Sequence, residues 1–147
     1  MRYYDYNIVL QEVPNEVSLS LSITGCKLSC DGCHSPYLWK EHGEILTNEI
    51  FTDLLNKYTG LISCVLFMGG EWHEEELVNL LSLSKSMGLK TCLYTGLDKV
   101  NDIILSNIDY IKYGKWVKEL GGLENINTNQ IFLDVKNNKI LNNYFIK

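Results

Sequence analysis

Residues 26–34 read Cys26-Lys27-Leu28-Ser29-Cys30-Asp31-Gly32-Cys33-His34, and they decide how the rest of the sequence is interpreted. This stretch holds three of the five cysteines of the 147-residue chain and directly follows a strand-like run over residues 17–23. Three thiols at this spacing are typical of a metal-binding loop. A structural zinc ion takes four protein ligands, whereas three thiolates on a [4Fe–4S] cluster leave one iron open. The count of three therefore favours an iron–sulfur cluster held by Cys26, Cys30 and Cys33.

The cysteine loop also fits three other kinds of site, each less well. Residues 30–34 match the C-x-x-C-H pattern of haem attachment, but that site needs a secreted chain and leaves Cys26 unused. A thioredoxin-like dithiol would use Cys30 and Cys33 alone. His34 would have to complete a zinc site, although neighbouring side chains of an extended loop point apart and no second C-x-x-C supplies a ligand. Zinc remains open, and it would make the chain a non-catalytic module that recognises a partner.

Composition limits the classes of function that this chain can have. Apolar residues make up 46% and charged residues 21%, as in ordinary globular proteins, and the length is most simply that of one domain over residues 1–147. A net charge of −5 with scattered lysines argues against nucleic-acid binding. We expect no membrane segment, since no apolar run is long enough, and a cytoplasmic setting, since no apolar signal segment follows Arg2. There, the cysteines would be thiols or metal ligands.

Strand and helix signals alternate along the chain. Residues 17–23 alternate Val, Leu, Leu and Ile with serine, which predicts a strand with one buried face. The elements predicted after the cysteine loop are a helix from its N-cap Thr47 to Gly60, a strand over residues 61–68 covered on both faces, a helix over 74–87, a strand over 89–94, a short helix over 100–108 and a strand over 110–113. A peripheral hairpin is predicted near the end of the chain, turning at Asn137-Asn138.

This alternation predicts an α/β fold with βαβ units and a parallel sheet. Ligands of such sheets bind beyond the carboxyl ends of the strands. The four loops expected there are the cysteine loop, Gly69-Gly70-Glu71, Tyr94-Thr95-Gly96 and Gly114-Lys115. The sequence therefore predicts that these separate motifs meet at one edge of the sheet.

Two of the motifs together resemble a known superfamily. Cys26-x-x-x-Cys30-x-x-Cys33 resembles the cluster motif of the radical S-adenosylmethionine superfamily, and Gly69-Gly70-Glu71 resembles its Gly-Gly-Glu motif. Within it, the string from Cys26 to Trp39 is most similar to the glycyl-radical-enzyme activases, above all those of anaerobic ribonucleotide reductases. Residues 94–96, 114–116 and 129–130 are similar to further stretches of these activases. The resemblance implies a single-domain partial (β/α) barrel with parallel strands and a cluster loop after the first barrel strand.

The resemblance also implies two cofactors and their ligands. Cys26, Cys30 and Cys33 would hold a [4Fe–4S] cluster whose open iron binds S-adenosylmethionine, and reductive cleavage would release methionine and a 5′-deoxyadenosyl radical. The residues that it assigns to S-adenosylmethionine are Gly32, His34, Gly69, Gly70, Glu71, Thr95 and Lys115. Glu71 would bind the methionine ammonium and Lys115 the carboxylate. The two glycines of the Gly-Gly-Glu motif would allow a close approach of the backbone.

The partners implied by the resemblance are proteins. The substrate would be a glycine Cα–H of the large glycyl radical subunit of anaerobic ribonucleotide reductase, and a flavodoxin or ferredoxin would donate the electron. An activase of another glycyl radical enzyme, of the pyruvate formate-lyase type, and a small radical enzyme acting on a metabolite remain open. Cys64 and Cys92 fall within predicted strands and are expected to be buried apolar residues. The pattern does not decide whether Trp72 belongs to the core or to a partner surface.

Overall fold

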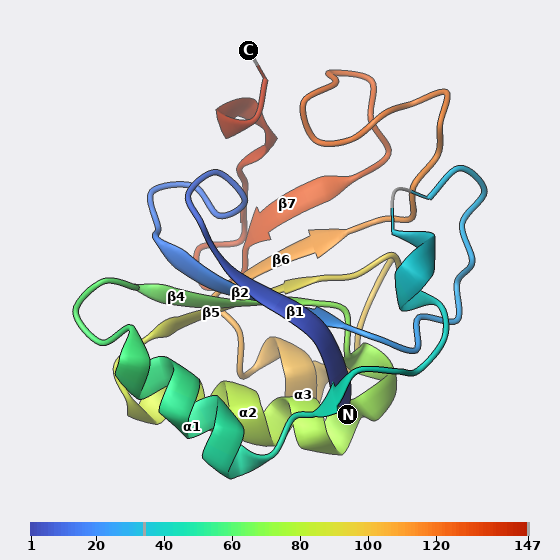
Figure 1. Ribbon diagram of the computed structural model, residues 1–147. Helices are drawn as coiled ribbons and strands as arrows, with labels where there is room; N and C mark the ends of the chain where they lie inside the picture. Colours follow the sequence, from blue (N-terminus) through green and yellow to red (C-terminus); the bar gives the residue numbers. More distant parts are fainter. Residues whose placement is uncertain (34, 147) are drawn as a thin grey trace.

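The computed structural model describes residues 1–33 and 35–146, and these residues form a mixed α/β fold around one eight-stranded sheet (Figure 1). The strands are β1 (Arg2–Val9), β2 (Ser18–Ile23), β3 (Glu44–Ile45), β4 (Cys64–Met68), β5 (Lys90–Tyr94), β6 (Tyr110–Tyr113), β7 (Ile131–Asp134) and β8 (Lys139–Ile140). The helices are α1 (Asn48–Lys57), α2 (Glu74–Ser86) and α3 (Asp102–Leu105), with short 3-10 turns η1 (Pro36–Leu38), η2 (Glu71–His73) and η3 (Asn142–Tyr144). The strand order is β3-β1-β2-β4-β5-β6-β7-β8.

The four central strands are parallel, as the alternation of helix and strand signals predicts. β2 pairs with β4, β4 with β5 and β5 with β6, each in parallel register. The three α-helices lie together against one face of this sheet (Figure 1). The loops that follow these strands therefore lie at one edge of the sheet. Among the described helices, none is long and apolar enough to cross a membrane.

Two apolar clusters, one on each face of the sheet, account for the burial of the central strands. Val65 and Phe67 of β4 belong to the cluster that includes the apolar side chains of the helices, and the Phe67 ring stacks on Phe51 of α1 at 5.8 Å. Cys64 and Leu66 of the same strand belong to the cluster on the other face. This alternation follows from the period of two in a strand. It confirms the prediction of a strand covered on both faces and that of a buried Cys64.

The serine face of β2 is buried, which differs from the sequence prediction. A strand with one buried face was expected, but Ser18 and Ser20 are buried as well as Leu19 and Leu21. The Ser20 hydroxyl lies 3.5 Å from the Met68 sulfur on the neighbouring strand. The prediction was wrong because alternation reports polarity only, whereas a small hydroxyl is also accommodated beneath a covering layer.

Antiparallel strands extend the parallel centre on both sides. β1 pairs with β2, and β7 pairs with β6 and forms a hairpin with β8. The predicted hairpin is thereby confirmed, and Asn138 in its turn has a positive φ of 50°. β1 was expected only as a short apolar segment over residues 6–10, because Arg2–Val9 shows no alternation of apolar and polar residues.

The N-terminus of α1 depends on one side chain. The Thr47 hydroxyl accepts a hydrogen bond of 3.1 Å from the backbone N–H of Ile50, as the predicted N-cap requires. Thr47→Ala should therefore lower the free energy of unfolding by about 1 kcal/mol in a denaturant titration. Thr47→Ser is the matched control and should keep most of the stability, because its hydroxyl can still accept the bond. Equal losses in both variants would mean that the methyl group matters and the cap does not.

Candidate metal centre

Backbone hydrogen bonds anchor the start of the cysteine loop after β2 and close its other end into a turn. The backbone N–H groups of Gly25 and Cys26 both donate to the carbonyl of Leu38, at 2.8 and 3.0 Å. At the other end, the N–H of Cys33 donates to the carbonyl of Cys30 at 3.1 Å, which closes a turn over the two intervening residues. Cys30 and Cys33 thus stand at the two ends of one turn, and Cys26 stands at the anchored start of the loop.

The three thiols of this loop are partly exposed and form no disulfide. The backbone N–H of Ser35 donates a hydrogen bond to the Cys33 sulfur at 3.3 Å. Burial raises the pKa of the Cys26 thiol, and negative charge on Glu71, Cys30 and Cys33 raises it further. The three sulfurs therefore repel one another when ionised, and a bound cation relieves that repulsion.

No three Cys, His, Asp or Glu side chains among the described residues are gathered closely enough to hold a metal ion. The thiols are thus not arranged as a finished chelate, and ligand sites commonly reach their final geometry only with the metal. The donor set nevertheless fits a cluster, since it consists of three thiols on one anchored loop that are coupled through their charges. Cys64 and Cys92 take no part in it, because both are buried within β4 and β5 as predicted.

Trp72 and Leu28 join the cysteine loop to the ends of β4 and β5. The Trp72 ring covers Gly69, whose missing Cβ would lie 2.6 Å from the ring, and its indole nitrogen lies beside Gly25. Leu28 packs against Gly96 closely enough that a Cβ there would overlap it. Trp72 is therefore a packing residue between the cysteine loop and the end of β4, a role that the sequence pattern left undecided.

Glu71 is a largely buried charged side chain at this edge of the sheet. Its Oε1 atom accepts a 2.7 Å hydrogen bond from the hydroxyl of Thr95, which is 2% exposed. Its Oε2 atom is buried and has no hydrogen-bond partner among the described residues. Burial raises the pKa of the carboxyl, while the bond from Thr95 and the positive charge of Lys112 act in the opposite direction. A buried carboxylate with one unused oxygen fits the binding of a cationic group.

The other residues expected to bind S-adenosylmethionine lie in different surroundings. Gly69 and Gly70 follow β4 with φ values of 92° and 110°, and the missing Cβ of Gly70 faces Met1 and Ile23. These contacts explain the need for glycine through conformation and packing. Gly32, with φ of 70°, lies beside the Trp116 ring. Lys115 is exposed.

His34 lies outside the described residues.

A cavity of about 770 Å³ opens on the face of the sheet opposite the helices. Residues from separate elements line it, among them Cys33, Met68, Tyr94, Lys112, Gln130 and Phe145.

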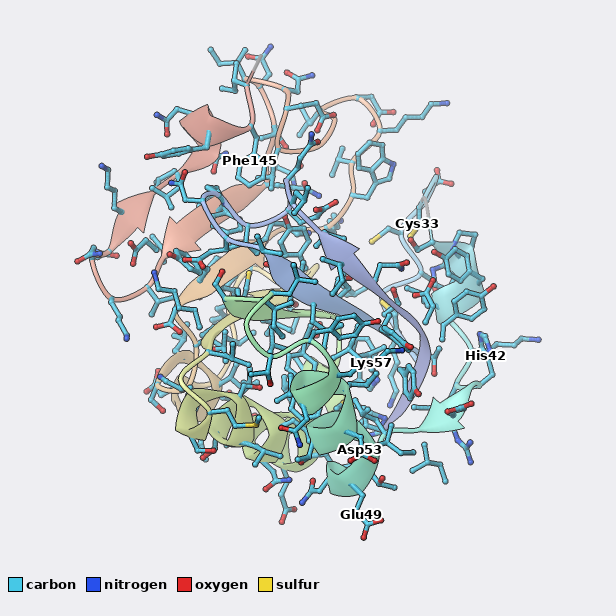
Figure 2. All side chains as sticks on the ribbon, turned by 60° about the vertical axis from the view of Figure 1, so that its left-hand side comes forward. Cys33, His42, Glu49, Asp53, Lys57 and Phe145 are labelled. Atoms are coloured by element: carbon cyan, nitrogen blue, oxygen red, sulfur yellow. The ribbon has the colours of Figure 1, made fainter. Side chains whose placement is uncertain are left out.

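Two of the side chains labelled in Figure 2, Cys33 and Phe145, line this cavity. Cys33 and Phe145 lie well apart from Glu49, Asp53 and Lys57 of α1. Lys112 is the functional candidate that the sequence patterns missed. The signal for it was a lysine inside the otherwise apolar strand Tyr110–Tyr113.

Comparison with known proteins supports the iron–sulfur interpretation. Residues 16–132 match a family model described as a 4Fe-4S single cluster domain. This match begins before β2, ends in β7 and includes the whole cysteine loop. A search of curated proteins found no match, and a search of solved structures found none. The match covers most of the chain, and the chain therefore belongs to the 4Fe-4S single cluster domain family.

Proposed function

We propose that this protein is a radical S-adenosylmethionine enzyme that generates a glycyl radical on the large subunit of an anaerobic ribonucleotide reductase. The observation that carries the proposal is the buried Glu71 carboxylate, bonded through one oxygen to Thr95 and unpartnered at the other among the described residues. It lies close enough to the cysteine loop for its charge to act on Cys26. An iron–sulfur loop beside a site for a cation is the combination that this cofactor pair needs.

The residues of this chain would have three tasks in that reaction. Cys26, Cys30 and Cys33 would hold the cluster, and the unused oxygen of Glu71 would accept a charge-assisted hydrogen bond from the ammonium of S-adenosylmethionine. Thr95 fixes the carboxylate through its hydroxyl. When bound, the cluster and S-adenosylmethionine supply the electron transfer that splits the sulfonium and yields a carbon radical.

The cavity supports a protein substrate. It is open to solvent and is lined by apolar side chains of the sheet and of the C-terminal segment, such as Met68 and Phe145. A glycine-bearing loop of the reductase would enter it, and the apolar walls would keep water away from the reacting Cα–H. β2, β4, β5 and β6 would supply the strands of the partial barrel implied by the resemblance. A flavodoxin or ferredoxin would deliver the electron.

The test is the formation of a glycyl radical. Reconstituted protein, a low-potential reductant and S-adenosylmethionine are incubated without oxygen with the large subunit of an anaerobic ribonucleotide reductase. Electron paramagnetic resonance should then show the doublet of a glycyl radical, and methionine should accumulate. Cleavage of S-adenosylmethionine without a doublet would reject this partner, and the absence of cleavage would reject the proposed chemistry.

Glu71→Gln should stabilise the cluster-free protein but weaken binding of S-adenosylmethionine by the cluster-loaded protein. Burial raises the pKa of Glu71 in the folded state, so the folded protein binds the carboxyl proton more tightly than the unfolded chain does. Ionisation of this carboxyl therefore lowers the free energy of unfolding as the pH rises from the pKa of the unfolded chain through the pKa of the folded protein. At neutral pH the cluster-free variant should melt at a higher temperature than the wild type, and the gain should vanish below roughly pH 4. Loaded with the cluster, it should bind S-adenosylmethionine at least about tenfold more weakly.

Glu75→Gln on the exposed surface of α2 is the matched control for this experiment. It removes an equal charge at a position exposed to solvent. It should raise neither the melting temperature nor the dissociation constant for S-adenosylmethionine. A Glu71→Gln variant that melts lower than the wild type at neutral pH would contradict the assignment of Glu71 as a desolvated carboxylate.

A further inference from the structure

Lys112 presents an ammonium group to the cavity from the strand that ends beside the cysteine loop. In the sheet it is aligned with Tyr94 on one side and Phe132 on the other. Both rings belong to the apolar surface opposite the helices, so Lys112 projects from that same face. Its Nζ lies 5.5 Å from the centroid of the Tyr94 ring. A lysine in this position stands between an apolar wall and the open space of the cavity.

The ammonium group of Lys112 has N–H donors that are not used by the described residues. Its Nζ donates to the carbonyl of Gly114 at 3.2 Å, which uses one of its three N–H donors. Among the described residues, two lysines form ion pairs within 4.0 Å, Lys90 with Glu16 and Lys136 with Asp109. Lys112 forms none there. An ammonium group with unused N–H donors beside an apolar wall can bind an anion through charge-assisted hydrogen bonds.

Lys112 and the Glu71 site are parts of one hydrogen-bonded unit. The backbone N–H of Thr95 donates to the carbonyl of Lys112 at 2.9 Å, and the Thr95 hydroxyl donates to Glu71 at 2.7 Å. Burial lowers the pKa of Lys112 to about 8, while the charges of Glu71, Cys30 and Cys33 oppose this shift. The positive and negative groups thus act on each other without forming an ion pair. Such a separated pair is complementary to a zwitterion, whose ammonium faces the carboxylate and whose carboxylate faces the ammonium.

We propose that Lys112, and not the exposed Lys115, binds the carboxylate of the amino-acid end of S-adenosylmethionine while Glu71 binds its ammonium. This inference rests on the proposed function and names a residue for it that no motif indicated. The resemblance implied that Lys115 binds the carboxylate. In the structure Lys115 is exposed, whereas Lys112 lines the cavity together with Cys33.

The experiment compares two ligands on cluster-loaded protein in the absence of reductant. Equilibrium binding is measured for S-adenosylmethionine and for decarboxylated S-adenosylmethionine, which lacks only the carboxylate. Lys112→Met should weaken binding of S-adenosylmethionine by roughly ten- to a hundredfold, the worth of a charge-assisted hydrogen bond, and should change binding of the decarboxylated ligand less than about twofold. Any contact of the carboxylate with iron cancels in this comparison, because it is lost equally by wild type and variant.

Two further variants and two control measurements keep the result interpretable. Lys115→Met should bind both ligands as the wild type does, and Lys112→Arg should recover part of the lost affinity. Iron content and melting temperature show whether each variant is folded and loaded. Equal weakening of both ligands by Lys112→Met, or a larger effect of Lys115→Met, would overturn this inference while leaving the proposed function intact. A loaded wild-type protein that binds no S-adenosylmethionine would overturn both.

Discussion

Cys30→Ala should abolish the iron–sulfur cluster and every reaction that depends on it. Cys30 lies at one end of the turn that Cys33 closes, in a loop with three thiols. Removal of one thiolate leaves two ligands, too few to hold a [4Fe–4S] cluster against loss to solvent. After anaerobic reconstitution, the variant should contain almost no iron or sulfide and should lack the visible absorbance of a cluster.

Cys64→Ala is the matched control, since it also removes one thiol from the chain. Cys64 is fully buried in β4, and burial raises the pKa of its thiol to about 12, so it is not ionised at neutral pH. This variant should keep the full iron content and lose only a modest amount of stability, because a small buried side chain becomes smaller. If both variants lose iron equally, Cys30 is not a specific ligand and the choice of cysteines is wrong.

Gly69→Ala should be the most damaging substitution near the site outside the cysteines. A side chain at φ of 92° costs about 1–2 kcal/mol in backbone strain. The new Cβ would also lie 2.6 Å from the Trp72 ring, and relief of such an overlap typically costs a further 1–3 kcal/mol or so. A total loss of roughly 2–5 kcal/mol should appear in denaturant unfolding. Iron loading should fall as well, because Trp72 also packs against Gly25 beside the first ligand.

Two variants separate strain from overlap at Gly69. Gly88→Ala has a similar positive φ of 78°, but a Cβ there meets nothing within 4 Å, so it should show the backbone cost alone. Trp72→Leu removes the ring that Gly69→Ala would strike. The double variant should therefore lose less stability than the sum of the two single variants. Additive losses would show that the Trp72 ring is not what excludes a side chain at residue 69.

The periodicity of apolar residues and the helix-capping residues predicted the centre of the fold because both signals are local in sequence. The apolar run that became β4 and the cap at Thr47 need only neighbouring residues to be recognised. β1 was missed because it is stabilised by pairing with β2, and its own sequence does not alternate. The burial of Ser18 was missed for a related reason, since the layer that covers it comes from distant parts of the chain.

The sequence predicted part of the candidate site. It did not predict the direction in which the side chains of that site point. The motifs placed the three cysteines and Glu71 at one edge of the sheet, where the structure has them. A motif does not tell which of two lysines on one segment points into a cavity. Lys115 follows the strand end yet is exposed, whereas Lys112 sits within β6 and reaches the cavity. That distinction depends on the register of β6 against its neighbours.

In the proposed function, three cysteines hold a cluster whose fourth iron binds S-adenosylmethionine. Electron paramagnetic resonance of the reduced, reconstituted protein, recorded before and after addition of S-adenosylmethionine, tests it most directly. We predict the signal of a reduced [4Fe–4S] cluster and a clear change of that signal when S-adenosylmethionine is added, because one iron gains new ligands. A protein that carries zinc and no iron, or a cluster whose signal does not respond to S-adenosylmethionine, would contradict the account.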